Sequence, residues 1–88
     1  MLLALPKTRY LLEPAFVAVE ILSEDDRMSK VIEKLEEYIQ KGVANIWLID
    51  PRLRKMFTFR SNTLREAEDV IAADDPRLEL TREEVFQY

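Results

Sequence analysis

The sequence predicts an α/β fold in which a mixed sheet is built around a strand–helix–strand crossover. Three segments carry this prediction: an apolar run over residues 15–22, an amphipathic stretch over 26–41 and a second apolar run over 44–50. Two buried strands joined by a helix normally lie parallel in one sheet. With 88 residues, of which 48% are hydrophobic, we expect a single domain over residues 1–88.

The first two strand candidates are separated by prolines. Residues 1–13 are interrupted by Pro6 and are typical of irregular or edge-strand structure. Pro14 opens the strand over 15–22, which is apolar on both alternating faces. A strand of that kind is predicted to be central and to be covered on each side.

The helix over about 26–41 is predicted from apolar residues at helical spacing. These positions are Met28, Val31, Ile32, Leu35, Tyr38 and Ile39. Residues 23–26 offer capping side chains, and their acids suit the positive end of a helix. Gly42, the only glycine, follows where a left-handed C-terminal cap is required.

The remaining elements are shorter. The strand over 44–50 ends in an Asp50-Pro51 turn signal, and residues 55–60 alternate in polarity as the next strand would. Residues 64–73 indicate one or two weak strands. Thr81 and Glu84 have the spacing of a capping box, which predicts a short terminal helix.

Composition excludes several kinds of chemistry. The chain has no Cys and no His, so thiol catalysis, disulfides, zinc sites with nitrogen or sulfur ligands and His-dependent triads are ruled out. An oxygen-ligated Mg²⁺ remains compatible. The net charge of −4 argues mildly against sequence-independent nucleic-acid binding, although a basic groove can lie on an acidic protein. The apolar start is too short for a signal peptide or membrane span, so we expect a cytoplasmic protein.

Glu20 is the first candidate site residue, because it interrupts an apolar strand. A charge buried there is costly unless another group pairs with it or uses it. By alternation it shares a face with Phe16, Ala18 and Leu22. The functional interpretation is a metal-ligating carboxylate at the end of a central strand. The structural interpretation, which the residues alone favour, is an acid that reaches solvent or pairs with a lysine.

Lys34 is the second candidate. It borders the apolar stripe of the helix beside Tyr38, so its side chain can bend toward the neighbouring strand. A lysine there could position an attacking water and stabilise phosphoryl charge, whereas a boundary lysine that keeps its charge in water is the commoner case.

Other polar and aromatic groups have simpler interpretations. Aromatic residues that could stack on bases lie inside periodic apolar segments, which favours core packing. They are Trp47, Tyr38, Phe57 and Phe59. The basic turn Arg52, Arg54 and Lys55 is expected to be solvated, and the acids of 24–26 are explained by helix capping.

Several of these features occur together in a known pattern. An apolar strand ends in Glu20-Ile21-Leu22-Ser23, Lys34 and Tyr38 follow four apart, and Gly42-Val43 leads into a strand ending in Asp50-Pro51. The stretch 14–51 thereby resembles the Uma family, which is assigned to the restriction endonucleases of the PD-(D/E)XK nuclease superfamily. The resemblance implies a restriction-endonuclease-like fold and Mg²⁺-dependent hydrolysis of nucleic acid, with DNA favoured over RNA as the substrate.

The same resemblance implies the site residues. Glu20 and Lys34 would be catalytic, and Glu20 would ligate the metal. The superfamily lysine that normally stands two residues after the acid, here Leu22, would have moved to Lys34 on the helix.

The chain also departs from this family. Family members are much longer, and the first acid of the superfamily, which comes from an earlier strand, has no counterpart, since no Asp precedes Asp25. We therefore expect a partial domain, truncated at the N-terminus, that is inactive or weak unless a partner completes the site. An Asp or Glu close to Glu20 in the fold, for example Asp50, would favour the nuclease.

Two alternatives remain open. One is a non-catalytic remnant of the same fold that forms a homodimer, and the other is a small acidic interaction module. Self-association is expected because the strand over 15–22 would have few upstream elements to cover it, leaving apolar surface or an open edge.

Overall fold

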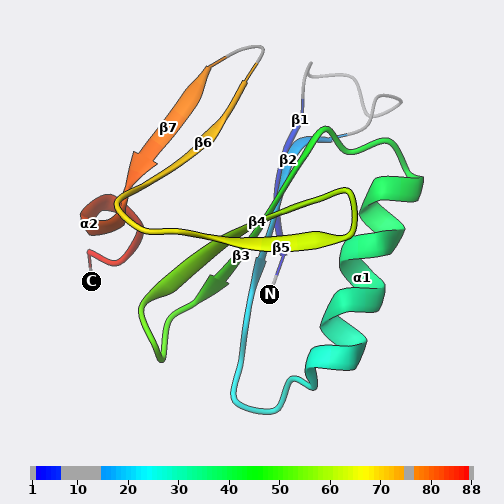
Figure 1. The fold of residues 1–88 in the computed structure, drawn as a ribbon, viewed down its shortest axis with the longest axis horizontal. Helices are drawn as coiled ribbons and strands as arrows, with labels where there is room; N and C mark the ends of the chain where they lie inside the picture. Colours follow the sequence, from blue (N-terminus) through cyan, green and yellow to red (C-terminus); the bar gives the residue numbers. More distant parts are fainter. Residues whose placement is uncertain (1, 7–14, 75–76, 88) are drawn as a thin grey trace.

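The computed structural model describes residues 2–6, 15–74 and 77–87, which form a three-layer α/β arrangement (Figure 1). The elements in chain order are β1 (Leu2–Pro6), β2 (Ala15–Ile21), α1 (Met28–Gln40), β3 (Asn45–Asp50), β4 (Lys55–Arg60), β5 (Thr63–Ala67), β6 (Val70–Ala73), β7 (Leu78–Thr81) and α2 (Arg82–Val85). A five-stranded sheet in the order β1-β2-β3-β4-β5 lies between α1 and a separate β6-β7 hairpin that leads into α2.

The sheet is mixed, as predicted. β2 and β3 are parallel, with Glu20 opposite Leu48 and Ile21 opposite Ile49. β1 pairs antiparallel with β2, and β3, β4 and β5 form an antiparallel meander. The predicted crossover is therefore confirmed, and β2 is an interior strand.

Two hydrophobic cores lie on opposite faces of this sheet. On the α1 face the buried residues are Val31, Leu35, Ile46, Leu48 and Phe59. On the opposite face, called here the hairpin face, they are Val17, Trp47, Ile49, Met56, Ile71, Ala73 and Phe86. Because side chains alternate along β3, this strand contributes to both cores, and all of its residues except Asp50 are buried. Core packing is confirmed for Trp47 and Phe59.

α2 is attached to the hairpin face through Phe86. The backbone N–H of Glu84 donates to Thr81 Oγ1 (3.1 Å) and that of Thr81 donates to Glu84 Oε1 (2.9 Å), so the predicted capping box is confirmed. The ring of Phe86 is buried, with the guanidinium carbons of Arg54 and Arg82 at 5.1 and 5.8 Å from its centroid. Arg54, expected in a solvated turn, thus also packs on an aromatic ring.

The start of α1 differs from the prediction. The helix begins at Met28, and its N-cap, Arg27, makes no side-chain capping hydrogen bond. Asp26 Oδ2 instead accepts from the backbone N–H of Ser23 (2.8 Å), which closes a turn before the helix. That hydrogen bond is the main cause of the lowered pKa of Asp26. The prediction that residues 23–26 cap the helix is therefore wrong, because their acid is used by the preceding turn.

The end of α1 is fixed by a Schellman motif at Gly42. Gly42 has φ 83°, the left-handed conformation predicted for it. Its N–H donates to Ile39 O and the N–H of Val43 donates to Tyr38 O, both at 3.0 Å. The last helical turn, which carries Tyr38, is thereby held in a defined position.

A tight hairpin connects β4 to β5. Ser61 and Asn62 have φ of 51° and 58°, as a type I′ turn requires, and they place Thr63 opposite Arg60. The region 64–73 contains parts of two strands, β5 and β6. β7 was not predicted, because its four residues are too few to show a period. Among the described residues, no helix is both long and apolar enough to cross a membrane.

We expect Gly42→Ala to lower the free energy of unfolding by about 1–2 kcal/mol, because a Cβ is disfavoured at positive φ. Asn62→Gly is the matched control: it also lies at positive φ, and glycine relieves strain there, so stability should be unchanged or higher. Urea unfolding measures both variants. Equal effects of the same sign would contradict this account.

Candidate functional site

Glu20 lies on the α1 face of the interior strand β2. Its side chain is 2% exposed, and its register partner is Leu48, which belongs to the core beneath α1. An ionised carboxylate in that position has lost most of its hydration, so its remaining interactions decide whether the position is tolerated.

One helix supplies both partners of this carboxylate. Lys34 Nζ lies 3.6 Å from Glu20 Oε1, and the Tyr38 hydroxyl donates to Glu20 Oε2 at 3.1 Å. Residues four apart share a helix face, which explains why both reach the same acid. The Lys34 side chain is 55% exposed, so the ion pair connects a buried charge to the solvent boundary. Among the described residues, no buried side-chain polar atom lacks a hydrogen-bond partner.

Tyr38 is the site residue that sequence reasoning missed. The apolar stripe placed it in the core, and it does pack against that core, but its hydroxyl is directed to Glu20. Burial, followed by the negative charge of Glu20 and the hydrogen bond to it, raises the pKa of Tyr38 to about 12. At neutral pH the phenol is therefore a fully protonated donor. The signal in the sequence that could have identified Tyr38 as a site residue was its position four residues after Lys34.

Asp50 does not join Glu20. Its Oδ1 accepts from the backbone N–H groups of Arg52 (3.1 Å) and Leu53 (3.2 Å), as in an Asx turn. Within the described part of the chain, no group of three or more His, Cys, Asp or Glu side chains could hold a metal ion. The structure thus places Asp50 in a turn of its own, and Glu20 does not face solvent.

The described residues do not fit a complete Mg²⁺ site. Mg²⁺ prefers six oxygen ligands in octahedral geometry, of which one or two are usually carboxylates. Here each oxygen of the Glu20 carboxylate already has a partner, and its side chain is closed to solvent. Leu22 packs against the α1 face, and the positive charge near Glu20 comes from Lys34.

A second feature lies at the carboxyl ends of β2 and β3. A hollow of about 560 Å³ is bordered by the loop before α1 and by the turn after β3. Its acids are Glu24, Asp26 and Asp50, and the last two are already engaged by backbone N–H groups. Glu20 does not line this hollow.

Comparison with known proteins gives a family and a fold. The family model Uma2, described as "Putative restriction endonuclease", matches residues 3–87. The crystal structure of a "putative nuclease belonging to DUF820" from Anabaena variabilis ATCC 29413 matches with a TM-score of 0.65 and 25% identity. That match covers 83% of this chain and 44% of the other, so the chain spans less than half of that relative. No curated protein matches.

We expect Lys34→Met to lower the free energy of unfolding by about 1–3 kcal/mol, because it leaves a buried carboxylate with one partner fewer. Lys30→Met is the control: its pair with Glu33 is exposed, so the change should be within about 0.5 kcal/mol. Urea unfolding measures both, and Glu20→Gln added to Lys34→Met should recover the loss. Equal stability of the two single variants would show that the ion pair contributes nothing.

The raised pKa of Tyr38 predicts a loss of stability in alkali. The folded state holds the phenolic proton more tightly than the unfolded chain, whose tyrosine pKa is 10.0. The contribution of Tyr38 is therefore complete below pH 10 and is lost as the pH rises toward about 12. The difference in phenolate absorbance between wild type and Tyr38→Phe isolates this titration. Glu20→Gln should lower the pKa of Tyr38 only in part, because burial remains. An ordinary pKa in the wild type would contradict the hydrogen bond.

Proposed function

The chain belongs to the Uma2 family, and from that premise we propose that it carries part of a nuclease site that hydrolyses phosphodiester bonds in DNA. The observation that carries the proposal is the buried Glu20 carboxylate, held by Lys34 and Tyr38 from one helix. The nuclease-like family and fold support it, and the proposal assigns catalytic roles to Glu20 and Lys34.

Lys34 is suited to contact the substrate. Its ammonium lies near Glu20 while its side chain remains half exposed, so a phosphate oxygen can approach it from solvent. A fixed positive charge at the edge of an apolar core stabilises negative charge that develops on a phosphoryl group. The buried carboxylate keeps this charge in place, because the ammonium cannot leave without exposing an unpaired acid.

Tyr38 positions the carboxylate. Its hydroxyl donates to one oxygen, which directs the other toward Lys34. Because the pKa of Tyr38 is raised to about 12, this donor does not change with pH in the neutral range. The orientation of Glu20 is therefore set by a neutral group and a charged group on successive turns of α1.

We further propose that the site uses Mg²⁺, and that Glu20 becomes one ligand when the metal replaces Lys34 or Tyr38 at a carboxylate oxygen. The other ligands would come from outside the described residues, because those residues contain no group of three or more His, Cys, Asp or Glu that could hold a metal ion. For the chain alone this arrangement implies weak activity at most. A second copy of the chain is one source of the missing groups, and the proposal therefore includes a homo-oligomer.

The alternative is a non-catalytic module of the same fold that forms a homodimer. The apolar surface expected around β2 is covered in the structure, because β2 lies between β1 and β3 and its Val17 and Ala18 are buried. The strands at the two margins of the five-stranded sheet, β1 and β5, are places where a second copy could add.

A cleavage assay tests the proposal. We expect slow nicking of supercoiled DNA by the wild-type chain at high concentration with Mg²⁺ or Mn²⁺. Glu20→Gln and Lys34→Met should abolish it, because they remove the carboxylate and the positive charge. The control Lys30→Met, in which an exposed lysine of the same helix is lost, should retain full activity.

The other outcomes are equally informative. Cleavage that persists in Glu20→Gln would come from a contaminant or another site, and the proposed roles would be wrong. No cleavage by wild type, together with a dimer mass in light scattering, would favour the non-catalytic module.

A further inference from the structure

A polar strip on the hairpin face lies apart from Glu20. The register pairs Thr58 with both Trp47 and Arg65, and Arg60 with Thr63. Toward the other end of the same strands, the pair Met56 and Ala67 packs beneath the hairpin. The hairpin face of β4 and β5 thus changes along its length from apolar to polar and cationic. If the whole face were buried in a core, its side chains would stay apolar along its full length.

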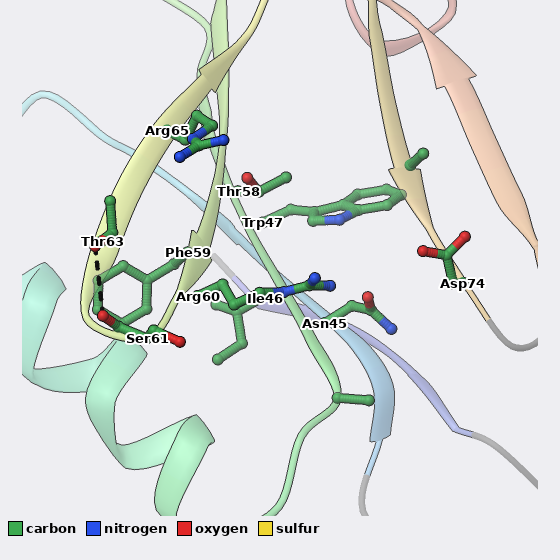
Figure 2. A pocket seen from close by; sticks show the side chains of 12 residues that line it. Asn45, Ile46, Trp47, Thr58, Phe59, Arg60, Ser61, Thr63, Arg65 and Asp74 are labelled. Atoms are coloured by element: carbon green, nitrogen blue, oxygen red, sulfur yellow. Dashed lines mark hydrogen bonds between the residues drawn. The ribbon is translucent and has the colours of Figure 1, made fainter.

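A groove lies over the part of the hairpin face that is polar. The β6-β7 hairpin covers the apolar half of the face, and a cavity of about 470 Å³ remains over the polar half, with Ala72 and Asp74 of the hairpin side on its border (Figure 2). Figure 2 shows the Trp47 indole extending beneath it toward the hairpin, with Arg60 and Arg65 on either side of Thr58. We call this cavity the arginine groove.

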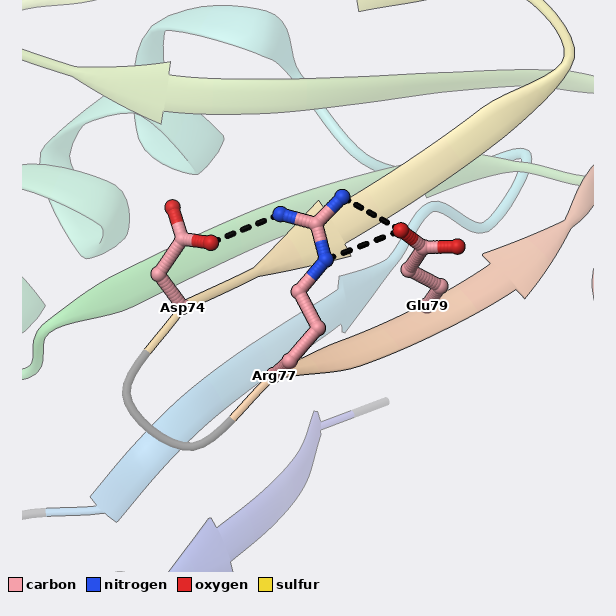
Figure 3. Close-up of polar contacts among 3 residues, drawn as sticks. All are labelled: Asp74, Arg77 and Glu79. Carbon is pink, nitrogen blue, oxygen red and sulfur yellow. Dashed lines mark hydrogen bonds and ion pairs between the residues drawn. The ribbon is translucent and has the colours of Figure 1, made fainter.

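The two arginines of the groove have no acidic partner in the described part of the chain. Neither Arg60 nor Arg65 forms an ion pair with a carboxylate that the structure describes. Asp74, the one acid among the described residues that line the groove, is occupied elsewhere: Arg77 Nη1 donates to its Oδ1 at 2.7 Å (Figure 3). Arg77 also binds Glu79, and these two carboxylates raise its pKa. The border acid is thus neutralised, and the groove is left positive.

The donors in the groove are those that bind phosphate. Guanidinium groups present paired N–H donors that match phosphate oxygens. The hydroxyls of Thr58 and Ser61 line the same space and make no hydrogen bond to the described residues. The Thr63 hydroxyl is already used, since it donates to Ser61 O at 3.4 Å. A volume of about 470 Å³ lies in the range of small-ligand pockets and exceeds the needs of a bare phosphate.

We propose that the arginine groove binds the phosphate of a nucleotide, with Arg60 and Arg65 on the phosphate oxygens and the sugar and base over the apolar side of the groove near Trp47. The phosphate could belong to a free nucleotide or to a single strand, and the chemistry of recognition is the same. Glu20 does not line the groove, and the paired residues Trp47, Thr58 and Arg65 lie on the hairpin face, so this binding does not depend on the proposed nuclease function.

Trp47 makes the test direct. It is the only tryptophan and it lines the groove, so its fluorescence reports on binding there. We expect a saturable fluorescence change with a nucleoside 5′-monophosphate or a short single-stranded oligonucleotide, and none with the nucleoside alone. The double variant Arg60→Gln, Arg65→Gln should weaken binding at least tenfold. It should also lower the slope of log affinity against log salt by about 1 for each arginine that contacts phosphate.

Two controls separate this site from others. Arg27→Gln removes an exposed arginine at the start of α1, outside the groove, and should leave binding unchanged. Glu20→Gln should also leave it unchanged, so a failure of the nuclease proposal would not affect this result. Circular dichroism confirms that the variants fold.

The remaining outcomes decide between sources or against the site. Tighter binding of the oligonucleotide than of the mononucleotide would identify a strand as the ligand, and equal binding would identify a free nucleotide. Binding of the nucleoside as strong as that of the nucleotide, binding unaffected by the double arginine variant, or no fluorescence change with any ligand would each overturn the proposal.

Discussion

Five consecutive register pairs hold β2 parallel to β3, and this pairing sets the position of the site. Parallel neighbouring strands need a crossover connection, so α1, which links β2 to β3, must lie across one face of the sheet. Leu35 of the helix and Leu48 of β3 are fully buried there, which fixes the helix against the sheet. Glu20 is the register partner of Leu48, and it therefore lies beneath the same helix. Lys34 and Tyr38 reach it because they border the packed stripe.

The buried carboxylate is a constraint that packing alone does not require. An apolar side chain at position 20 would extend the core between Leu48 and the helix without any desolvation cost. The chain instead carries an acid and uses two side chains of α1 to satisfy it. A charged side chain takes a core position most often where a protein needs the charge for binding or chemistry. Ion pairs with structural roles occur as well. Because Lys34 is half exposed, a ligand can reach it from solvent, which a fully enclosed ion pair would not allow.

The sequence was a good guide to the elements and a poorer one to side-chain partners. Apolar periodicity identified β2, α1 and β3, and Gly42 and Thr81 marked a cap at each of two helix ends, because these signals are local. The start of α1 was misplaced, because Asp26 can accept from backbone N–H groups on either side and the turn before the helix uses it. Tyr38 was assigned to packing alone, because a stripe defines a helix face but not the direction of a terminal hydroxyl. The Asx turn at Asp50 shows the same limit, because the sequence identifies the acid but not the backbone N–H group that donates to it.

The arginine groove could not be derived from any single segment. Thr58 and Arg65 become neighbours only through the β4-β5 register, which the two residues at positive φ, Ser61 and Asn62, determine. The net charge of −4 argued against nucleic-acid contact, yet the charge on one face of a protein can differ from its net charge. On the α1 face the chemistry centres on a buried acid, whereas on the hairpin face two arginines form no ion pair with a described carboxylate and the acid beside them is paired with Arg77. A sheet with a helix on one side and a hairpin on the other keeps these opposite charges apart. Each face therefore has its own arrangement of charge.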